Sequence, residues 1–236
     1  MDALYHHQIL KRALGAHVSL RALEAIYRAN IGQDLRGLFG HPEYHFDENA
    51  IVESLAYIEE CRALATRTES PAEAWSAFGR LSHAAQDFYA HSNYVRLWAA
   101  QFDGRAPLPD PREAPPERRG GGPLVGKTSD RGREWPPVES MDGLDPSLLK
   151  HPRLMTCRMY WPVEALYFVP GLGPLVKRFL PKDAHAWMNL DNPKTGRLFP
   201  YAMEAAVQRT VAEYERTLAA IGEERGEEAV KAFCDV

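Results

Sequence analysis

Cysteine is scarce and scattered in this chain. Only Cys61, Cys157 and Cys234 occur among 236 residues, and no two of them form a C-x-x-C pair. With an odd number of widely spaced cysteines, neither a disulfide framework nor a cysteine zinc site can be read from the sequence.

An excess of positive charge is also missing. The chain has 28 Lys and Arg against 32 Asp and Glu, a formal net charge of −4. Binding of duplex nucleic acid needs clustered positive charge, so the composition excludes that class of function. The first residues, MDALYHHQILKRAL, lack the basic and apolar stretches of a signal peptide. We therefore expect a cytoplasmic protein, or one whose leader was removed before Met1.

Strand patterns are lacking too, because no stretch shows sustained alternation of apolar and polar residues. Instead, apolar residues recur at the three- and four-residue steps of helices. Ser70-Pro71-Ala72-Glu73 is a capping box that opens a long helix to about Ala100. Asp47 is expected to cap a helix that ends near residues 61–65. The sequence predicts an all-α protein, with further helices at 3–14, 18–31, 199–221 and 223–233, the last two broken near Gly222.

Residues 101–149 differ from the rest, since they hold nine of the 18 prolines and seven of the 17 glycines. We expect an irregular insertion within a single domain spanning residues 1–236. Residues 121–128, GGPLVGKT, match the phosphate-loop pattern. That pattern needs a strand before it and a helix after it. Here proline-rich sequence precedes it and no apolar-faced helix follows, so we reject a nucleotide site.

Residues 159–180 form the most apolar stretch of the chain. Three prolines and Glu164 interrupt it, which argues against a membrane-spanning helix. A buried helical hairpin is one interpretation. The other is a peripheral membrane contact, with Lys177 and Arg178 near lipid phosphates.

The nine histidines are placed unevenly. His83, Asp87 and His91 stand four residues apart and project along one helix face. Their neighbours are largely apolar, so the face is expected to be buried, where imidazole and carboxylate groups need partners. Zinc takes such ligands at ~2.0–2.2 Å. A solvent-facing polar stripe and a hydrogen-bonded core histidine are the alternatives.

The order of these elements resembles the zinc-dependent phospholipase C and single-strand-specific zinc nuclease superfamily. The run SHAAQDFYAHSNYV is most similar to its Het-C branch. His6, with Ile9 three residues later, matches the first-helix histidine of that family. Asp34 matches its metal-bridging aspartate, and His45 its His-Phe pair before acidic residues. The last family element is His-x-x-x-Glu, which His185 and the following residues match with Asn189 in place of the Glu.

The resemblance covers residues 3–98 and 183–221 and implies two or three Zn²⁺ ions. Its implied metal ligands are His6, Asp34, His45, His83, Asp87, His91 and His185. Asp34 would also hold and deprotonate a bridging water. Residues implied to orient the ligands or to contact substrate are Asn189, Asp191, Gln86, Asn93 and Tyr89, with Asp191 also able to substitute for the missing Glu.

The function implied by the resemblance is phospholipase C-type hydrolysis of phospholipid head-group phosphodiesters by a metal-activated water. The partner would be a phospholipid or another phosphodiester, with membrane contact through residues 159–180. One alternative is a zinc-dependent nuclease or nucleotidase of the same superfamily. The other is a non-catalytic, Het-C-like membrane-associated protein in which the metals only stabilise the fold.

Overall fold

The structure is a computed structural model, and it describes residues 1–37, 40–102 and 136–235. These residues are mainly helical, and their only strand-like features are two isolated bridges, Ser92 with Thr156 and Arg158 with Ala184. The prediction of an all-α protein is confirmed.

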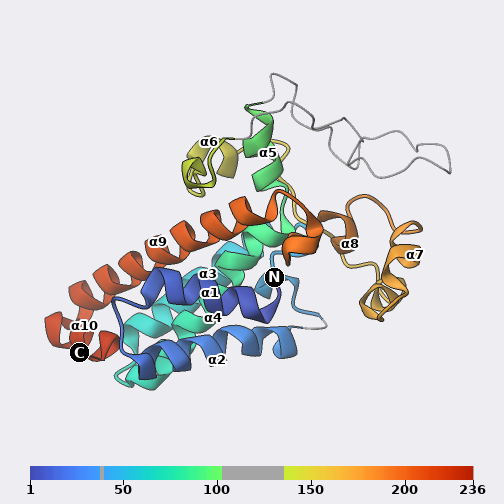
Figure 1. The fold of residues 1–236 in the computed structure, drawn as a ribbon. Coiled ribbons are helices and arrows are strands. Elements are labelled where there is room, and N and C mark those ends of the chain that lie inside the picture. The colour runs from blue at the N-terminus through green and yellow to red at the C-terminus, as the bar shows by residue number, and fades with distance from the viewer. Residues whose placement is uncertain (38–39, 103–135, 236) are drawn as a thin grey trace.

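A bundle of five long helices forms most of the molecule (Figure 1). Helix α4 lies at its centre and packs against α2, α3 and α9, while α1 packs against α2 and α9. Almost every α4 side chain from Ala77 to His91 is buried, so polar groups on this helix must find partners inside the protein. The bundle helices are α1 (Ala3–Leu14), α2 (Leu20–Arg36), α3 (Ile51–Arg67), α4 (Pro71–His91) and α9 (Phe199–Arg225).

Shorter elements complete the fold. Helix α10 (Glu227–Cys234) packs against α9 and α4 at the far end of the bundle. The others are η1 (Pro42–Tyr44), α5 (Tyr94–Ala100), η2 (Val138–Ser140), α6 (Pro146–Leu149), η3 (Val163–Phe168), α7 (Gly173–Lys177), α8 (His185–Met188) and η4 (Pro193–Thr195).

A glycine lets α2 and α4 approach each other closely. A Cβ atom added at Gly79 would lie 2.3 Å from the carbonyl oxygen of Ile26 and 2.7 Å from Cβ of Ala29. Real Cβ atoms do not come so near to backbone oxygen, so only glycine fits at this crossing. The close contact places Asn30 and Asp34, on the next turns of α2, opposite the polar face of α4.

Several helix boundaries differ from the prediction; helix α2, for example, ends at Arg36 and not at residue 31. Helix α4 starts as expected, with Ser70 Oγ accepting a hydrogen bond from the backbone N–H of Glu73, but it ends at His91. The chain breaks there because Asn93 forms hydrogen bonds with the backbone of Met155 and Arg153. Near the C-terminus the break falls at Gly226 (φ +81°), four residues after the predicted one.

The predicted Asp47 cap is wrong. Helix α3 begins at Ile51 after Ala50, and no side chain caps it. The Asp47 carboxylate instead lies 3.1 Å from His91 Nδ1 and accepts a hydrogen bond from Cys157 Sγ. Because the carboxylate contacts His91 and Cys157, it is not available to cap the helix.

The proline-rich insertion falls partly outside the described residues. Residues 103–135 and the phosphate-loop match at 121–128 are not described. Residues 136–149 pack on α9, where Tyr201 donates a hydrogen bond to the carbonyl of Pro136 and Gln208 to that of Met141. This end of the insertion carries η2 and α6.

Residues 158–182, here called the apolar lobe, form η3 and α7 beside the bundle (Figure 1). Most of their apolar side chains are exposed, so the buried-hairpin interpretation is wrong. No helix in the described part of the chain is long and apolar enough to cross a membrane. Glu164 is buried and fastens the lobe to α8. Its carboxylate accepts hydrogen bonds from the backbone N–H groups of Tyr160 (2.8 Å) and Ala186 (2.6 Å).

Candidate metal centre

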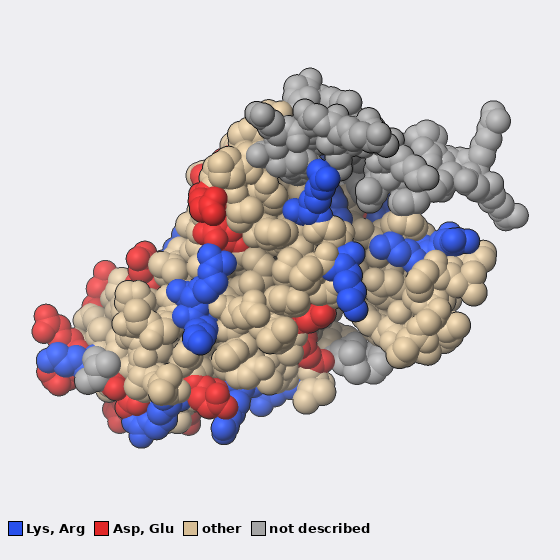
Figure 2. Space-filling model, viewed as in Figure 1, with Lys and Arg blue, Asp and Glu red and all other residues tan. Residues whose placement is uncertain are grey.

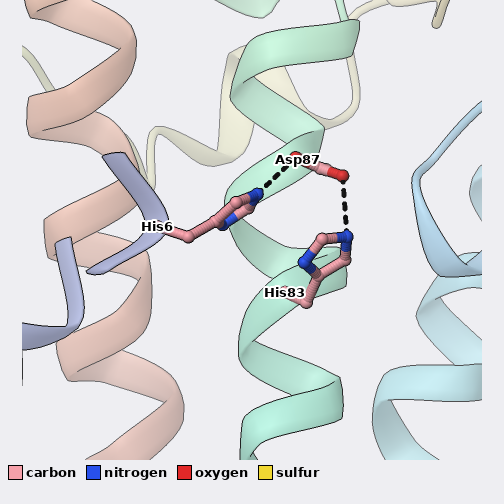
Figure 3. Close-up of side chains that lie close together, drawn as sticks. All are labelled: His6, His83 and Asp87. Atoms are coloured by element: carbon pink, nitrogen blue, oxygen red, sulfur yellow. Dashed lines mark ion pairs between the residues drawn. The ribbon is translucent and has the colours of Figure 1, made fainter. Parts of the chain in front are cut away.

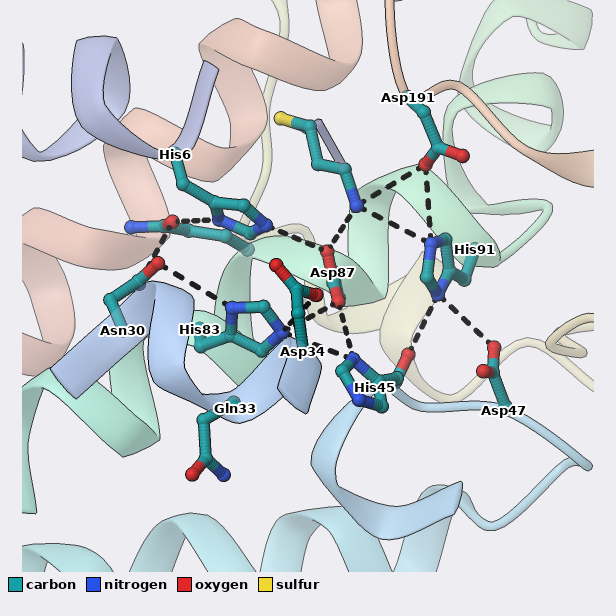
Figure 4. Close-up of polar contacts among 12 residues, drawn as sticks. His6, Asn30, Gln33, Asp34, His45, Asp47, His83, Asp87, His91 and Asp191 are labelled. Atoms are coloured by element: carbon teal, nitrogen blue, oxygen red, sulfur yellow. Dashed lines mark hydrogen bonds and ion pairs between the residues drawn. The ribbon is translucent and has the colours of Figure 1, made fainter. Parts of the chain in front are cut away.

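Seven predicted ligands converge at one end of the bundle. Figure 4 shows all of them except His185. They come from five places in the fold: α1, α2, the loop after η1, α4 and α8. Several sets of three can each offer ligand atoms within 4.8 Å of one another, which is what a metal ion requires. The converging residues are His6, Asp34, His45, His83, Asp87, His91 and His185.

The first group of ligand atoms lies between α4 and the loop after η1. His45 Nδ1 lies 3.0 Å from His83 Nε2 and 3.0 Å from Asp87 Oδ2, and His83 Nε2 lies 3.1 Å from Asp87 Oδ2. Asp34 Oδ1 is 3.6 Å from His83 Nε2. Ligands at ~2.0 Å from a tetrahedral zinc ion stand about 3.3 Å apart. The first group therefore has nearly the spacing of a metal coordination shell.

The second group lies at the C-terminal end of α4. His91 Nε2 is 3.3 Å from His185 Nε2, and each ring contacts a different oxygen of Asp191 at 3.2 Å. The Met1 amine is 3.2 Å from Asp191 Oδ1 and 3.4 Å from His91 Nε2. These atoms also converge at the separations expected of ligands that share an ion.

Asp87 joins the first group to His6 and the Met1 amine. Its Oδ2 faces His45 and His83, whereas its Oδ1 lies 2.6 Å from the Met1 amine and 3.3 Å from His6 Nε2. Figure 3 shows the carboxylate between His6 and His83. Asp34, expected to be the bridging residue, lies at the edge of the cluster with its side chain 44% exposed. The geometry gives the bridging position to Asp87.

Hydrogen bonds on the outer side of the rings set their orientation. His6 Nδ1 lies 2.6 Å from Gln86 Oε1, and His83 Nδ1 lies 3.4 Å from Asn30 Oδ1. His91 Nδ1 contacts the carbonyl of His45 at 3.0 Å. Each of these nitrogens faces an acceptor and so carries a proton, which leaves the Nε2 lone pairs of His6 and His83 directed at the cluster.

Two buried ring nitrogens of the cluster, His6 Nε2 and His185 Nδ1, make no hydrogen bond with any described residue. His6 is fully buried, and its Nε2 lies 3.3 Å from Asp87 Oδ1 without a hydrogen bond. Leaving such an atom unsatisfied costs about 1–3 kcal/mol. A cation beside Asp87 Oδ1 would satisfy the ring nitrogen and the carboxylate together, so the donor set fits a metal ion.

The charges of His83, Asp87 and Asp191 agree with this, whereas His91 would have to lose a proton to bind a metal. Burial would lower the pKa of His91, but Asp87 and Asp47 hold it well above its usual value. Burial lowers the pKa of His83 to about 3, so its ring is neutral at neutral pH, the form that binds metals. Burial would raise the pKa of Asp87, but the Met1 amine and His83 hold it well below its usual value. Asp191 has a lowered pKa for related reasons, with the amine and His185 outweighing burial. Both carboxylates are therefore ionised and attract cations.

A pocket of about 680 Å³ opens onto the cluster. The cluster residues Asp34, His45, His91, His185 and Asp191 line one side, and Trp161, Ala165 and Phe168 of the apolar lobe line another. Small molecules could therefore reach the ligand atoms from solvent.

Comparison with known proteins points to a different family from the one suggested by the sequence motifs. Residues 3–110 match the family model of the VWA7 N-terminal domain. The rat protein named von Willebrand factor A domain-containing protein 7 is 36% identical over 84 residues, which is 34% of this chain and 9% of that protein. The chain thus matches less than a tenth of the length of this relative. No solved structure matches the chain significantly.

The assignment to the zinc phospholipase C and nuclease superfamily and its Het-C branch is therefore wrong. The phospholipase C function falls with it, and so do the nuclease and Het-C alternatives that depended on the same resemblance. The reason is physical. Any buried helix face can carry a His-x-x-x-Asp-x-x-x-His run. The spacing therefore indicates that the three side chains can share a site, but it does not indicate descent from a particular family.

The range that resembles the VWA7 N-terminal domain contains most of the cluster, from His6 to His91. His185 and Asp191 lie outside it. These two residues reach the cluster because the chain returns along the end of α4, where the backbone N–H of Leu190 donates to the carbonyl of Ala90. The second ligand group is thus assembled partly from sequence that the comparison does not cover.

Three further candidates lie away from the cluster. Tyr89 OH and Asn93 Nδ2 donate to the backbone carbonyls of Gly143 and Arg153, and Asn189 Nδ2 donates to the carbonyl of His185. Gln86 and Asp191 do join it. The sequence prediction missed Asp47, which contacts His91 Nδ1. Its place two residues after His45 was the available signal.

Proposed function

We propose that this protein binds two or three Zn²⁺ ions in the His–Asp cluster. One ion would be held by His45, His83 and Asp87, with Asp34 completing its shell at the pocket. Another would be held by His91, His185 and Asp191. His6 Nε2 and Asp87 Oδ1 offer the start of a third position. The single observation that carries the proposal is the triangle of His45 Nδ1, His83 Nε2 and Asp87 Oδ2, with sides of 3.0–3.1 Å.

The ligand chemistry supports zinc over Mg²⁺ or Ca²⁺. Magnesium and calcium take oxygen ligands almost entirely, whereas the cluster offers imidazole nitrogens beside carboxylates. Mixed nitrogen and oxygen ligands suit zinc and related transition metals. The hydrogen bonds that the His6 and His83 rings donate to Gln86 and Asn30 are of the kind that hold metal-binding histidines in place.

Zinc titration tests the proposal. Protein stripped with a chelator should take up two or three Zn²⁺ per chain, as counted by elemental analysis after dialysis. At free zinc 1,000 times above Kd, each ion should raise the free energy of unfolding by about 4 kcal/mol, because it binds only the folded cluster. Mg²⁺ at the same concentration should leave the thermal transition almost unchanged. A zinc content of zero would contradict the proposal.

The expectation of a metal-dependent hydrolase stays a prediction, now without a named substrate class. A bound zinc ion supplies an activated water, and the pocket would give a substrate access to it. Asp34, at the pocket edge, is the residue placed to accept a proton. Zinc-loaded protein should then hydrolyse chromogenic esters such as p-nitrophenyl acetate or bis(p-nitrophenyl) phosphate, and His83→Ala should lose this turnover. Loaded protein that turns over neither ester nor phosphoester would contradict it.

A further inference from the structure

The apolar lobe exposes large apolar side chains in unusual density. A small core of its own, including Val176 and Leu180, holds it together, so its outward-facing residues are not needed to bury that core. Phe179 is 77% exposed. Isolated surface apolar residues are normal, but a contiguous group marks an interaction surface. The exposed large side chains are Trp161, Val163, Leu166, Phe168, Val169, Leu172, Leu175 and Phe179.

The charges of the lobe all have one sign at its surface. Arg158 and Arg178 are exposed, and Lys177 and Lys182 are half-buried against the Trp187 ring. Glu164 is the one acidic residue among positions 158–182, and it is fully buried. The face of the lobe seen at the right of Figure 2 is correspondingly tan and blue. This contrasts with the net charge of −4 for the chain as a whole.

We propose that the apolar lobe docks on an anionic lipid surface. Its exposed aromatic and aliphatic side chains enter the head-group region, while Lys177, Arg178 and Lys182 contact lipid phosphates. Interfacial binding combines apolar burial with attraction of basic side chains to anionic lipids. The lobe offers both on one projecting element. A groove for a protein helix would instead need a concave apolar surface without a basic border.

Docking in this way would also orient the pocket. Trp161 and Phe168 line the pocket that leads to the cluster, and the Phe168 ring centroid is 5.8 Å from that of His185. A membrane under the lobe would therefore lie beside the pocket mouth. The proposal does not depend on metal binding, and both zinc-loaded and zinc-stripped protein should dock.

Vesicle co-sedimentation tests the lobe. The protein should sediment with vesicles of equal parts phosphatidylserine and phosphatidylcholine, less so as salt is raised, and much less with phosphatidylcholine alone. The double variant Leu175→Ser/Phe179→Ser should bind at least about tenfold more weakly, because two apolar side chains no longer enter the bilayer. Arg178→Glu changes two charges and should weaken binding to anionic vesicles about 25-fold, at about fivefold per charge.

The matched control is Leu20→Ser/Leu35→Ser on α2, where both side chains are 84% exposed. This variant removes equal exposed apolar surface outside the lobe and should bind like the unmodified protein. Thermal unfolding checks that every variant folds. Leu175 and Phe179 are exposed, so replacing them should not disturb the packing of the core.

The proposal is overturned if unmodified protein binds neither vesicle, or if the α2 control loses as much binding as the lobe variant. A self-association in size-exclusion chromatography that Leu175→Ser/Phe179→Ser abolishes, without vesicle binding, assigns the surface to a second copy and overturns it too.

Discussion

Asp87→Asn is expected to cost the cluster most of its zinc. The substitution keeps the shape of the side chain but removes the charge that faces His45 and His83 through Oδ2 and faces the Met1 amine and His6 through Oδ1. Partners that only orient a ligand are worth about 10–100-fold in metal affinity. We expect the loss of a shared ligand to exceed about 100-fold in Kd, measured by competition with a chromophoric zinc chelator. Zinc content after dialysis should fall by at least one ion per chain.

The same variant should destabilise the zinc-stripped protein. The Met1 amine is fully buried and lies 2.6 Å from Asp87 Oδ1, and breaking a buried ion pair from one side costs about 3–5 kcal/mol. Denaturant unfolding with and without a chelator separates this effect from metal loss. Asp34→Asn is the matched control. Its half-exposed side chain belongs to the first group only, so it should weaken one zinc position and leave the stripped protein nearly as stable. Equal zinc content in Asp87→Asn and unmodified protein would contradict the bridging role.

Gly79→Ala is expected to destabilise the protein by about 3 kcal/mol, at the upper end of what overpacking costs. The added methyl group would meet the backbone oxygen of Ile26 at 2.3 Å, and a backbone atom cannot rotate away. Helices α2 and α4 must separate, which moves Asn30 away from His83. Urea unfolding measures the loss of stability, and the chelator competition assay should show weaker zinc binding although no ligand has changed.

Gly32→Ala provides the control for that experiment. Gly32 is also within a helix, α2, but nothing lies within 4 Å of an added Cβ. Alanine is favoured over glycine by about 1 kcal/mol inside helices, so this variant should be more stable than the unmodified protein. Opposite signs at the two positions would show that the close crossing decides the result. A stabilised Gly79→Ala would contradict the account of the crossing.

Local periodicity was enough to predict the central part of the site. The spacing of His83, Asp87 and His91 places them on one face of α4 whatever the rest of the fold does, and the apolar neighbours indicated that this face is buried. The first helix, 3–14, was also predicted at its observed bounds. Both depend on interactions within a few residues, which a single sequence displays.

The remaining features depend on contacts between distant residues. The residues around Ser92 give no sequence signal for the end of α4. The helix ends there because the Asn93 side chain forms hydrogen bonds with the backbone of Met155 and Arg153, which are distant in sequence. Asp47 stands shortly before a helix, where an aspartate commonly caps the first turn, yet its carboxylate lies against His91. The sequence predicted a break near Gly222, but the chain turns at Gly226, where the backbone angle φ is +81°.

The choice of ligands outside α4 came from a resemblance to another family. The structure does bring His6, Asp34, His45 and His185 to the cluster, although the comparisons do not support the family that suggested them. A metal ion bound between packed helices requires histidine and carboxylate side chains at suitable spacing. Similar residue patterns therefore arise in proteins with different functions. The pattern predicted where the residues meet and not what the protein does.

The two hydrogen bonds of Glu164 have a thermodynamic consequence. They join the backbone of Tyr160, in the apolar lobe, to that of Ala186, the neighbour of His185. An ion that immobilised His185 would therefore also restrain the lobe, and a lobe held at a lipid surface would restrain His185. The backbone N–H of His185 also donates to the carbonyl of Arg158, so Glu164 and this hydrogen bond both couple the cluster to the lobe. The factor by which zinc alters the affinity for vesicles must equal the factor by which vesicles alter the affinity for zinc, so either titration measures the strength of this coupling.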